Sequence, residues 1–311
     1  SAQIPKQAVK DACNAYKRFF KGYSKSPKFK SKRKSKPSFF QREDKLKYKD
    51  SKVALEKIGW VKTAEPLPIG KYYNPRISHN GLNWYLTVGV EVAKPSLDKE
   101  TIEPIGIDVG IKDLAIFSTG EVVKNINNTR EIRRLNKKLK RLQCQASRHY
   151  EKLKSLNKNR KRGENRYEKS SNLLKLEKEI LKIHKRLNNI RTNHLHQATI
   201  KLVKAKPEYI VIEDLNIAGM MKNKYLARAV QEQKLYEFKR QLEYKCEWYN
   251  VRLIIADRFY PSSKTCSNCG QIKKDLKLSD RTYECDCGLS ISRDLNASIN
   301  LREYGRLKLV S

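Results

Sequence analysis

The sequence lacks the apolar segments that membrane-spanning and secreted proteins need. No apolar run approaches the roughly 18 residues that cross a bilayer. The first residues show no basic segment followed by an apolar segment and a cleavage site, so they do not predict secretion. Cysteine is scarce outside one cluster of four, which fits a reducing compartment better than a disulfide framework. We therefore expect a cytoplasmic protein without a membrane partner.

Acidic residues are few compared with basic ones. The 311 residues include 68 Lys and Arg but 33 Asp and Glu, which gives a formal net charge of +35 with His neutral. This excess is far larger than solubility requires, and it predicts a polyanionic partner. Because the signals for a membrane are missing, we expect that partner to be nucleic acid.

The first hundred residues predict a helix, a basic segment and a small antiparallel β unit. Apolar residues recur at helical spacing over residues 4–22. Residues 21–49 are basic, with interleaved phenylalanines, and form either a solvated loop or a loop that contacts nucleic acid. Strand-like runs fill 52–93, where Asn80-Gly81 predicts a hairpin. The candidate nucleic-acid contacts in the basic segment are Lys30, Lys32, Arg33 and Lys34.

Beyond residue 104, a second hairpin and two long helices are expected. The hairpin would use one strand over Ile105–Phe117 and a return at Val122-Val123. Residues 130–206 predict two antiparallel helices that share one apolar seam. Their outer faces are rich in Lys and Arg, and form either a solvated surface or one that follows phosphates. The candidate contacts on this surface are Arg133, Lys137, Lys140 and Arg141.

The remaining segments alternate between strands and helices. Tyr209–Glu213 and Val251–Ala256 are predicted as buried strands, separated by an amphipathic helix over Leu226–Tyr249. The last helix is expected over Asp294–Tyr304. Three single cysteines in helical contexts are predicted to be small buried side chains, namely Cys13, Cys144 and Cys246.

Three carboxylates stand beside apolar runs. Asp108 lies within Ile105–Val109, Glu213 ends Ile210–Ile212, and Asp294 precedes small residues that would allow tight helix docking. A charge in such a place costs several kcal/mol unless a partner compensates it. Turns and helix caps also use Asp, so each motif alone is weak. Together the three could hold two divalent ions for phosphodiester hydrolysis, and oxygen ligands without a nearby histidine favour Mg²⁺ or Mn²⁺ over Zn²⁺.

Four cysteines form the most specific local motif. Two close pairs, one with two intervening residues and one with a single intervening residue, suit one tetrahedral Zn²⁺. Gly270 and Gly288 directly follow the pairs, where such turns need a positive φ. Four thiolates leave no open position, so the zinc would be structural; two disulfides are the alternative. The ligands would be Cys266, Cys269, Cys285 and Cys287.

Four segments of the sequence together resemble the OrfB/TnpB proteins of insertion sequences. They are IGIDVGIKDLAIFSTGE, IVIEDLNIAGMMKN, FYPSSKTCSNCG and ECDCGLSISRDLNASINL. The family consists of RNA-guided DNA endonucleases related to type V CRISPR effectors, with a RuvC-like nuclease domain that a zinc-binding segment interrupts. The resemblance implies that Asp108, Glu213 and Asp294 are the catalytic carboxylates, and that guide RNA and target DNA are the partners.

The resemblance also implies an architecture. We expect an α/β chain with an RNase H-like (RuvC) nuclease domain, a zinc-ribbon-like insert and a helical hairpin, after a wedge-like β unit and a helical remnant. Family members usually start with a further strand and several helices, so an N-terminally shortened member with impaired targeting is expected. The predicted parts are a recognition-domain remnant (1–50), a wedge-like unit and linker (51–103), the nuclease core (104–259), the zinc module (260–290) and the final nuclease segment (291–311).

Three functions remain open at this point. The first is RNA-guided cleavage of DNA by two Mg²⁺ or Mn²⁺ ions. The second is binding of RNA or DNA without cleavage, and the third is strand transfer by a transposase, because hydrolysis and transesterification use the same carboxylates. The guide RNA, the target-adjacent motif and the oligomeric state are not predicted.

Overall fold

The chain divides into two units in the computed structural model, and each unit is described by itself. One unit contains residues 1–93 and 160–182, and the other contains residues 94–159 and 183–311. In the described part of the chain, no helix is both long and apolar enough to cross a bilayer. The structure describes residues 3–31, 35–96, 100–158, 160, 167–277 and 280–310.

The first unit combines one helix with two three-stranded antiparallel sheets. The helix confirms the prediction for residues 4–22, and its Asp11 accepts two hydrogen bonds from Arg76, at 2.7 and 2.8 Å. The sheets have the orders β1-β5-β6 and β2-β3-β4. Their elements are α1 (Gln3–Phe20), β1 (Ser38–Phe40), β2 (Lys47–Lys49), β3 (Lys52–Leu55), β4 (Gly59–Lys62), β5 (Tyr73–His79) and β6 (Trp84–Gly89).

Two details of this unit can be compared with the sequence analysis. The predicted hairpin is confirmed, because Gly81 has φ +92° between β5 and β6 and the Asn80 Oδ1 atom caps the turn. The prediction of a loop throughout residues 21–49 was wrong, because β1 and β2 lie in it. Phe39 packs against the apolar cluster of this unit, and β1 pairs with β5. A distant strand therefore orders a segment that has few apolar residues of its own.

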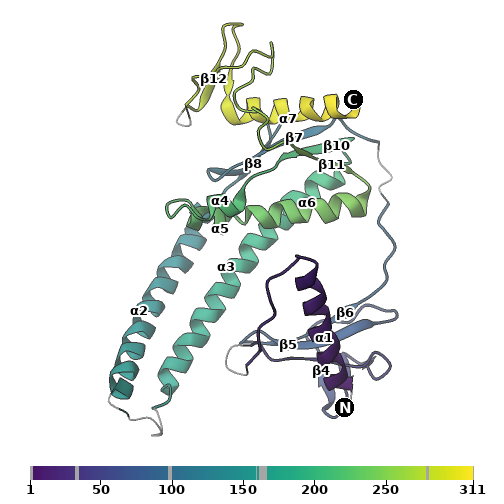
Figure 1. The fold of residues 1–311 in the computed structure, drawn as a ribbon, viewed down its shortest axis with the longest axis vertical. Helices are drawn as coiled ribbons and strands as arrows, with labels where there is room; N and C mark the ends of the chain where they lie inside the picture. The colour runs from purple at the N-terminus through teal and green to yellow at the C-terminus, as the bar shows by residue number, and fades with distance from the viewer. Residues whose placement is uncertain are drawn as a thin grey trace. The chain divides into compact units, whose positions relative to one another are not determined.

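A five-stranded mixed sheet forms the centre of the second unit (Figure 1). Its order is β11-β10-β7-β8-β9; β7, β8 and β9 are antiparallel neighbours, whereas β7, β10 and β11 run parallel. Alternate residues of β10 face opposite layers, because Ile210 and Ile212 pack with the helices on one face while Tyr209 and Val211 pack with the last helix. The strands are β7 (Ile105–Val109), β8 (Asp113–Phe117), β9 (Val122–Lys124), β10 (Tyr209–Glu213) and β11 (Arg252–Ala256).

Two strand predictions for this sheet need correction. The run Ile105–Phe117 is not one strand, because the chain turns back after Val109, where the Gly110 amide donates to the Leu114 carbonyl at 3.2 Å. The strand after residue 250 is not fully buried, and Ile255 is 42% exposed. Among the described strands β11 pairs with β10 alone, so it is an edge strand with one open side.

Helices cover both faces of the sheet (Figure 1). Leu235, Phe238 and Leu242 pack into the core cluster that contains Ile107 and Ile210. The helices are α2 (Arg130–Lys158), α3 (Ser171–Lys204), α4 (Ile217–Met220), α5 (Ala227–Gln233), α6 (Leu235–Tyr249) and α7 (Arg293–Val310), with a short 3₁₀ helix η1 (Ile126–Asn128).

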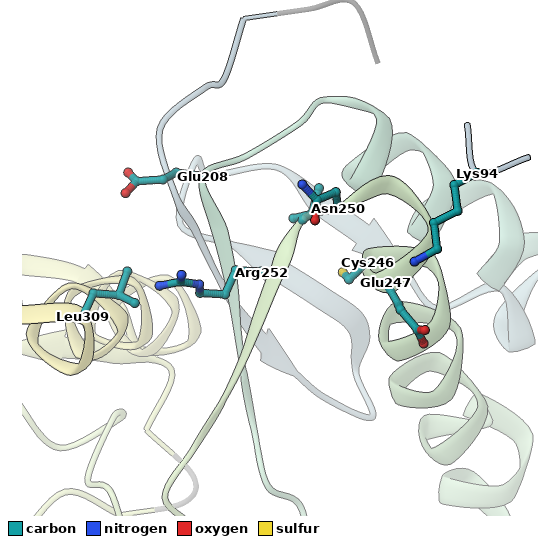
Figure 2. Close-up of a pocket in the computed structure, with 8 residues that line it drawn as sticks. Lys94, Glu208, Cys246, Glu247, Asn250, Arg252 and Leu309 are labelled. Atoms are coloured by element: carbon teal, nitrogen blue, oxygen red, sulfur yellow. The ribbon is translucent and has the colours of Figure 1, made fainter. Parts of the chain in front are cut away.

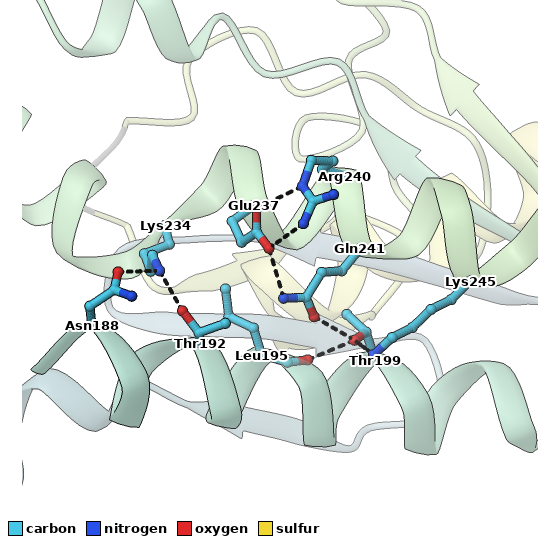
Figure 3. Close-up of polar contacts among 9 residues, drawn as sticks. All are labelled: Asn188, Thr192, Leu195, Thr199, Lys234, Glu237, Arg240, Gln241 and Lys245. Carbon is cyan, nitrogen blue, oxygen red and sulfur yellow. Dashed lines mark hydrogen bonds and ion pairs between the residues drawn. The ribbon is translucent and has the colours of Figure 1, made fainter. Parts of the chain in front are cut away.

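The helix predicted over Leu226–Tyr249 is broken at Lys234. That residue has φ +57°, which ends α5 before α6 begins. Its ammonium donates hydrogen bonds to Asn188 at 2.9 Å and to Thr192 at 2.5 Å, both on α3 (Figure 3). Contacts with another helix thus compensate for a backbone conformation that a lysine rarely adopts.

The contact between α3 and α6 is polar as well as apolar. Lys245 is buried and donates to the Thr199 hydroxyl at 2.6 Å, and Thr199 also lies 3.1 Å from Gln241 (Figure 3). The Lys245 pKa falls to about 8 because burial disfavours the ammonium ion. Because these polar side chains form hydrogen bonds with one another, they fix the position of α3 along α6.

The two long helices are present as predicted. Within the second unit, Ile132 and Leu139 of α2 and Ile183 and Leu187 of α3 are buried, and Glu131 pairs with Arg186 at 2.7 Å. The expectation for the single cysteines is confirmed for Cys246 and wrong for Cys13 and Cys144, which are exposed. The helix α1 has no buried residue, and Cys144 lies off the buried seam of α2, so helical periodicity alone misplaced them.

Candidate functional site

The three predicted carboxylates come from three elements of the second unit. Asp108 lies in β7 and Glu213 ends β10, and these neighbouring strands are parallel. Ile107 pairs with Ile212, so Asp108 and Glu213 occupy the next level of the sheet. Asp294 is in the first turn of α7, which packs across β7. Residues that are far apart in the sequence thus meet at one end of the central strands.

The pKa of Asp108 reflects the proximity of the other two carboxylates. Burial, and after it the Glu213 and Asp294 carboxylates, together raise the pKa of Asp108 to about 8, while Arg293 opposes the shift. Burial also raises the pKa of Glu213, against a hydrogen bond from Ser262. The site therefore disfavours the charged forms of Asp108 and Glu213, while Asp294 pairs with Arg293 at 3.5 Å. A divalent cation would stabilise these charged forms.

A close approach of two backbones places Asp294. Gly106, two residues before Asp108, lies under α7, and a Cβ atom on it would stand 2.0 Å from the Ser298 carbonyl oxygen and 2.5 Å from the Arg302 amide nitrogen. The expected tight docking is confirmed, because Ala297 and Ser298 are buried. Only glycine allows this contact, and the contact holds the start of α7 beside the end of β7.

The next acidic residue, Asp214, is neutralised by its neighbours. It pairs with Lys239 of α6 at 3.1 Å and with Arg258, and both hydrogen bonds lower its pKa. Glu213 instead contacts the Ser262 hydroxyl. Two consecutive carboxylates therefore have different partners: Asp214 ties the strand end to α6 and to the segment after β11, while Glu213 accepts a hydrogen bond from Ser262.

The four clustered cysteines converge as the sequence predicts. Their sulfur atoms all lie within 4.8 Å of one another, and they are the one such group of metal-binding side chains in the described part of the chain. The sulfurs of Cys266 and Cys287, and of Cys269 and Cys285, are 3.6 Å apart. Sulfur ligands at about 2.3 Å from Zn²⁺ stand at comparable separations. All four are free thiols, so this cluster could bind a structural zinc ion.

The turns and strands around the cysteines support this arrangement. Gly270 and Gly288 have φ +76° and +88°, which confirms the predicted turns. The strands β12 (Thr282–Glu284) and β13 (Ser290–Ser292) pair antiparallel, and buried Tyr283 donates to the Lys264 carbonyl at 3.1 Å.

Zinc removal is expected to unfold this module locally. Elemental analysis should find about one zinc per chain, because four thiolates complete a tetrahedral site. Cys269→Ser should lower the zinc content and make residues 260–290 sensitive to protease, whereas Cys144→Ser should change neither, because Cys144 lies outside the cluster. A zinc-free preparation with oxidised cysteines would contradict the prediction and favour the two disulfides.

The structure describes five of the eight predicted nucleic-acid contacts. Lys30 is exposed, and the Lys32, Arg33 and Lys34 predictions lie outside the described residues. The four candidates on α2 are all exposed and line two adjoining hollows of about 690 and 1150 Å³. They are Arg133, Lys137, Lys140 and Arg141.

Comparison with known proteins identifies the family. The profile described as "Probable transposase" (OrfB, IS605) matches residues 87–224, and the profile described as "Cas12f1-like, TNB domain" matches residues 236–301. A Streptomyces pristinaespiralis protein named "Putative RNA-guided DNA endonuclease" is 32% identical over 310 residues, which are 96% of this chain and 70% of that relative. The chain belongs to the OrfB/TnpB family.

The chain is also similar to a second relative and to a solved structure. The Escherichia coli K12 protein named "Putative RNA-guided DNA endonuclease InsQ" is 28% identical over 325 residues, which are 99% of this chain and 75% of that relative. A solved structure of a CRISPR-Cas12f ternary complex has 15% sequence identity and a TM-score of 0.46, over 92% of this chain and 67% of the solved one.

This OrfB/TnpB protein also has a cavity of about 560 Å³ away from the carboxylates (Figure 2). Glu208 and Arg252 line it; Glu208 precedes β10, whose other end carries Glu213, and Arg252 begins the neighbouring parallel strand β11. Lys94 and Glu247 add charges of opposite sign. Because its charges are mixed and it lies at the opposite end of β10, this cavity is not the candidate active site.

Three buried polar residues near the carboxylates were missed by the sequence analysis. They are Ser262, Asn296 and Asn300. The spacing of the two asparagines, four residues apart in the last helix, places both side chains on one face and was the available signal. Their partners lie in a different segment, which the sequence does not reveal.

Proposed function

We propose that this OrfB/TnpB protein is an RNA-guided DNA endonuclease that hydrolyses phosphodiesters in a RuvC-like site. The observation that carries the proposal is the half-buried Asp108, level with Glu213 in the sheet, whose anionic form is disfavoured by burial and by the Glu213 and Asp294 carboxylates. An anionic cluster of this kind, in a chain with a net charge of +35, suits a site where cations meet a phosphate backbone. The names of the two relatives support the same activity.

The topology supports an RNase H-like nuclease domain. Three antiparallel strands, β7, β8 and β9, are followed by β10, which joins the sheet beside and parallel to β7, and by β11, which joins beside and parallel to β10. Carboxyl ends of parallel strands are where open α/β sheets place their ligands. In this proposal the residues before 104 form a wedge-like unit and part of a recognition domain that hold the guide RNA.

The residues fit Mg²⁺ or Mn²⁺ better than Zn²⁺. Asp108, Glu213 and Asp294 offer hard oxygen ligands, although among the described residues only the cysteines form a compact metal-binding group. Ligands that two ions share need not converge on a single point. When bound, the ions would activate water and stabilise the leaving oxygen. The three carboxylates bind and orient the ions, and the fixed start of α7 holds Asp294 in place.

A cleavage assay tests the proposal. The full chain, purified with its RNA, is incubated with plasmid DNA that carries the sequence complementary to that RNA, with Mg²⁺ or with EDTA. We expect linear or nicked DNA that requires both Mg²⁺ and the matching sequence. Joined strands would indicate a strand transferase instead, and binding without any cut would indicate a nuclease-impaired relative.

The basic face of α2 is expected to bind the sugar-phosphate backbone. Exchanging Arg133, Lys137, Lys140 and Arg141 for Gln should weaken binding of every RNA–DNA duplex alike, because phosphate contacts carry no base information. The slope of log K against log salt should flatten by up to about 0.9 for each contact removed. Fluorescence anisotropy at several salt concentrations measures both quantities.

A variant that conserves charge provides the control for this prediction. Exchanging Arg for Lys and Lys for Arg at the same four positions keeps the charge and should keep the salt slope. Because the four side chains are exposed while Ile132 and Leu139 form the seam, circular dichroism should show intact helices in both variants. Equal affinity and equal salt slope in the Gln variant would show that this face is only solvated.

A further inference from the structure

The Ser262 side chain holds one oxygen of the Glu213 carboxylate. Ser262 is 4% exposed, and its hydroxyl donates to the Glu213 Oε1 atom at 2.5 Å. In the described part of the chain, the other oxygen, Oε2, has no hydrogen-bonding partner. One oxygen is therefore fixed while the second remains available as a ligand.

Two asparagines of α7 hold the backbone at this serine and directly after it. The Asn300 side chain donates to the Ser262 carbonyl at 2.7 Å and to the Thr265 carbonyl at 2.6 Å. The Asn296 side chain donates to the Thr265 carbonyl at 2.7 Å and accepts from the Ser267 amide at 3.0 Å. Because both asparagines are buried, the loss of any of these hydrogen bonds would cost folding free energy.

The held segment ends at a cysteine of the predicted zinc site. Cys266 directly follows Thr265, is 1% exposed, and has its sulfur 3.6 Å from that of Cys287. The helix that supplies the asparagines begins with Arg293 and Asp294. The segment 262–266 is thus anchored by the cysteine cluster, by α7, and by the carboxylate of Glu213.

We infer that Ser262 is a positioning residue for Glu213, and that the cysteine cluster and the asparagines Asn296 and Asn300 of α7 together keep it in place. The inference rests on the proposed function of Glu213 as a metal ligand. Partners that orient a metal ligand commonly change metal affinity or activity by about 10–100-fold when removed. The zinc module would then support the active site as well as its own fold.

Binding of Mn²⁺ alone, without nucleic acid, tests the inference. Free Mn²⁺ is measured by electron paramagnetic resonance in titrations of the full chain and its variants. Ser262→Ala should weaken Mn²⁺ binding by about 10–100-fold, and Ser262→Thr, which keeps the hydroxyl, should restore it. Ser263→Ala is the matched control, because the neighbouring serine does not contact Glu213 and should bind Mn²⁺ as the wild type does.

The zinc arm uses Cys269→Ser, with zinc content measured in every variant. Loss of zinc should weaken Mn²⁺ binding by a similar factor, although Cys269 does not contact Glu213. If Ser262→Ala does not fold, as judged by circular dichroism, Ser262→Cys takes its place, because a thiol of similar size is a weak donor. Intermediate affinity is then expected.

The outcomes separate this inference from the proposed function. Should Glu213→Ala bind Mn²⁺ as tightly as the wild type, the proposed metal site is wrong and the inference falls with it. Should Glu213→Ala lose binding while Ser262→Ala keeps wild-type affinity, the inference alone is overturned. Wild-type affinity in a zinc-free Cys269→Ser protein would overturn the link to the zinc module.

Discussion

Replacing Asp108, Glu213 or Asp294 by alanine is expected to abolish DNA cleavage without loss of the fold. Each change removes an oxygen ligand from the site where metal ions would stabilise the transition state by several kcal/mol. Because each 1.36 kcal/mol is a tenfold change in rate, we expect losses of on the order of 10³-fold or more. The cleavage rate with guide RNA, matching DNA and Mg²⁺ measures the effect.

Glu208→Ala is the matched control for these variants. Glu208 precedes the same strand that Glu213 ends, so its exposed carboxylate lies at the opposite end of β10 and should not affect the rate. RNA binding should be unchanged in all four variants. A carboxylate variant that retains Mg²⁺-dependent cleavage at the wild-type rate would remove that residue from the proposed site.

Asp108→Asn should also change the stability of the metal-free protein. The folded-state pKa of Asp108 is about 8 and its ordinary value is 3.8. Protonated Asp108 therefore contributes its full stabilisation of the fold below pH 3.8, and this contribution is lost as the pH rises toward 8. The reason is that the unfolded chain releases the proton at a lower pH than the folded chain does. Asp108→Asn should remove that loss and raise the Tm of the metal-free protein at pH 7. Mg²⁺ should stabilise the wild type and have less effect on the variant.

The sequence predicted features that depend on neighbouring residues. The apolar run Ile210–Ile212 identified a strand buried on both faces, since its pattern lacks alternation. The glycines after the cysteine pairs identified turns with positive φ, because local chemistry decides them. The three carboxylates were identified because a charge beside an apolar run costs free energy, and this is also a local signal.

Features that depend on distant partners could not be predicted. The periodicity through Lys234 continues as in one helix, and the break follows from hydrogen bonds to Asn188 and Thr192 on another helix. Ser262 and Glu213 are 49 positions apart, and a single hydroxyl in a loop carries no pattern that points to its carboxylate. Packing decides such contacts, so only the folded arrangement reveals them.

Gly106→Ala is expected to cause the largest loss of stability among single changes in the nuclease core. The added Cβ would lie 2.0 Å from the Ser298 carbonyl oxygen and 2.5 Å from the Arg302 amide nitrogen, both backbone atoms of α7. A backbone cannot move aside as a side chain can, so α7 must shift away from β7. Overpacking of a core costs about 1–3 kcal/mol and occasionally more. We expect the upper end, roughly a 6–12 °C fall in Tm for a domain of this size.

Gly110→Ala separates this steric effect from a general effect of replacing glycine. A Cβ on Gly110 would meet the Asp113 carbonyl oxygen at 3.2 Å, a contact that a small adjustment can relieve. Its Tm should therefore fall much less than that of Gly106→Ala in the same calorimetric scan. Because α7 carries Asp294, the Gly106 variant should also lose Mn²⁺ affinity at temperatures where it remains folded. A Gly106→Ala protein with the Tm of the Gly110→Ala protein would show that α7 does not dock on β7 as closely as the structure has it.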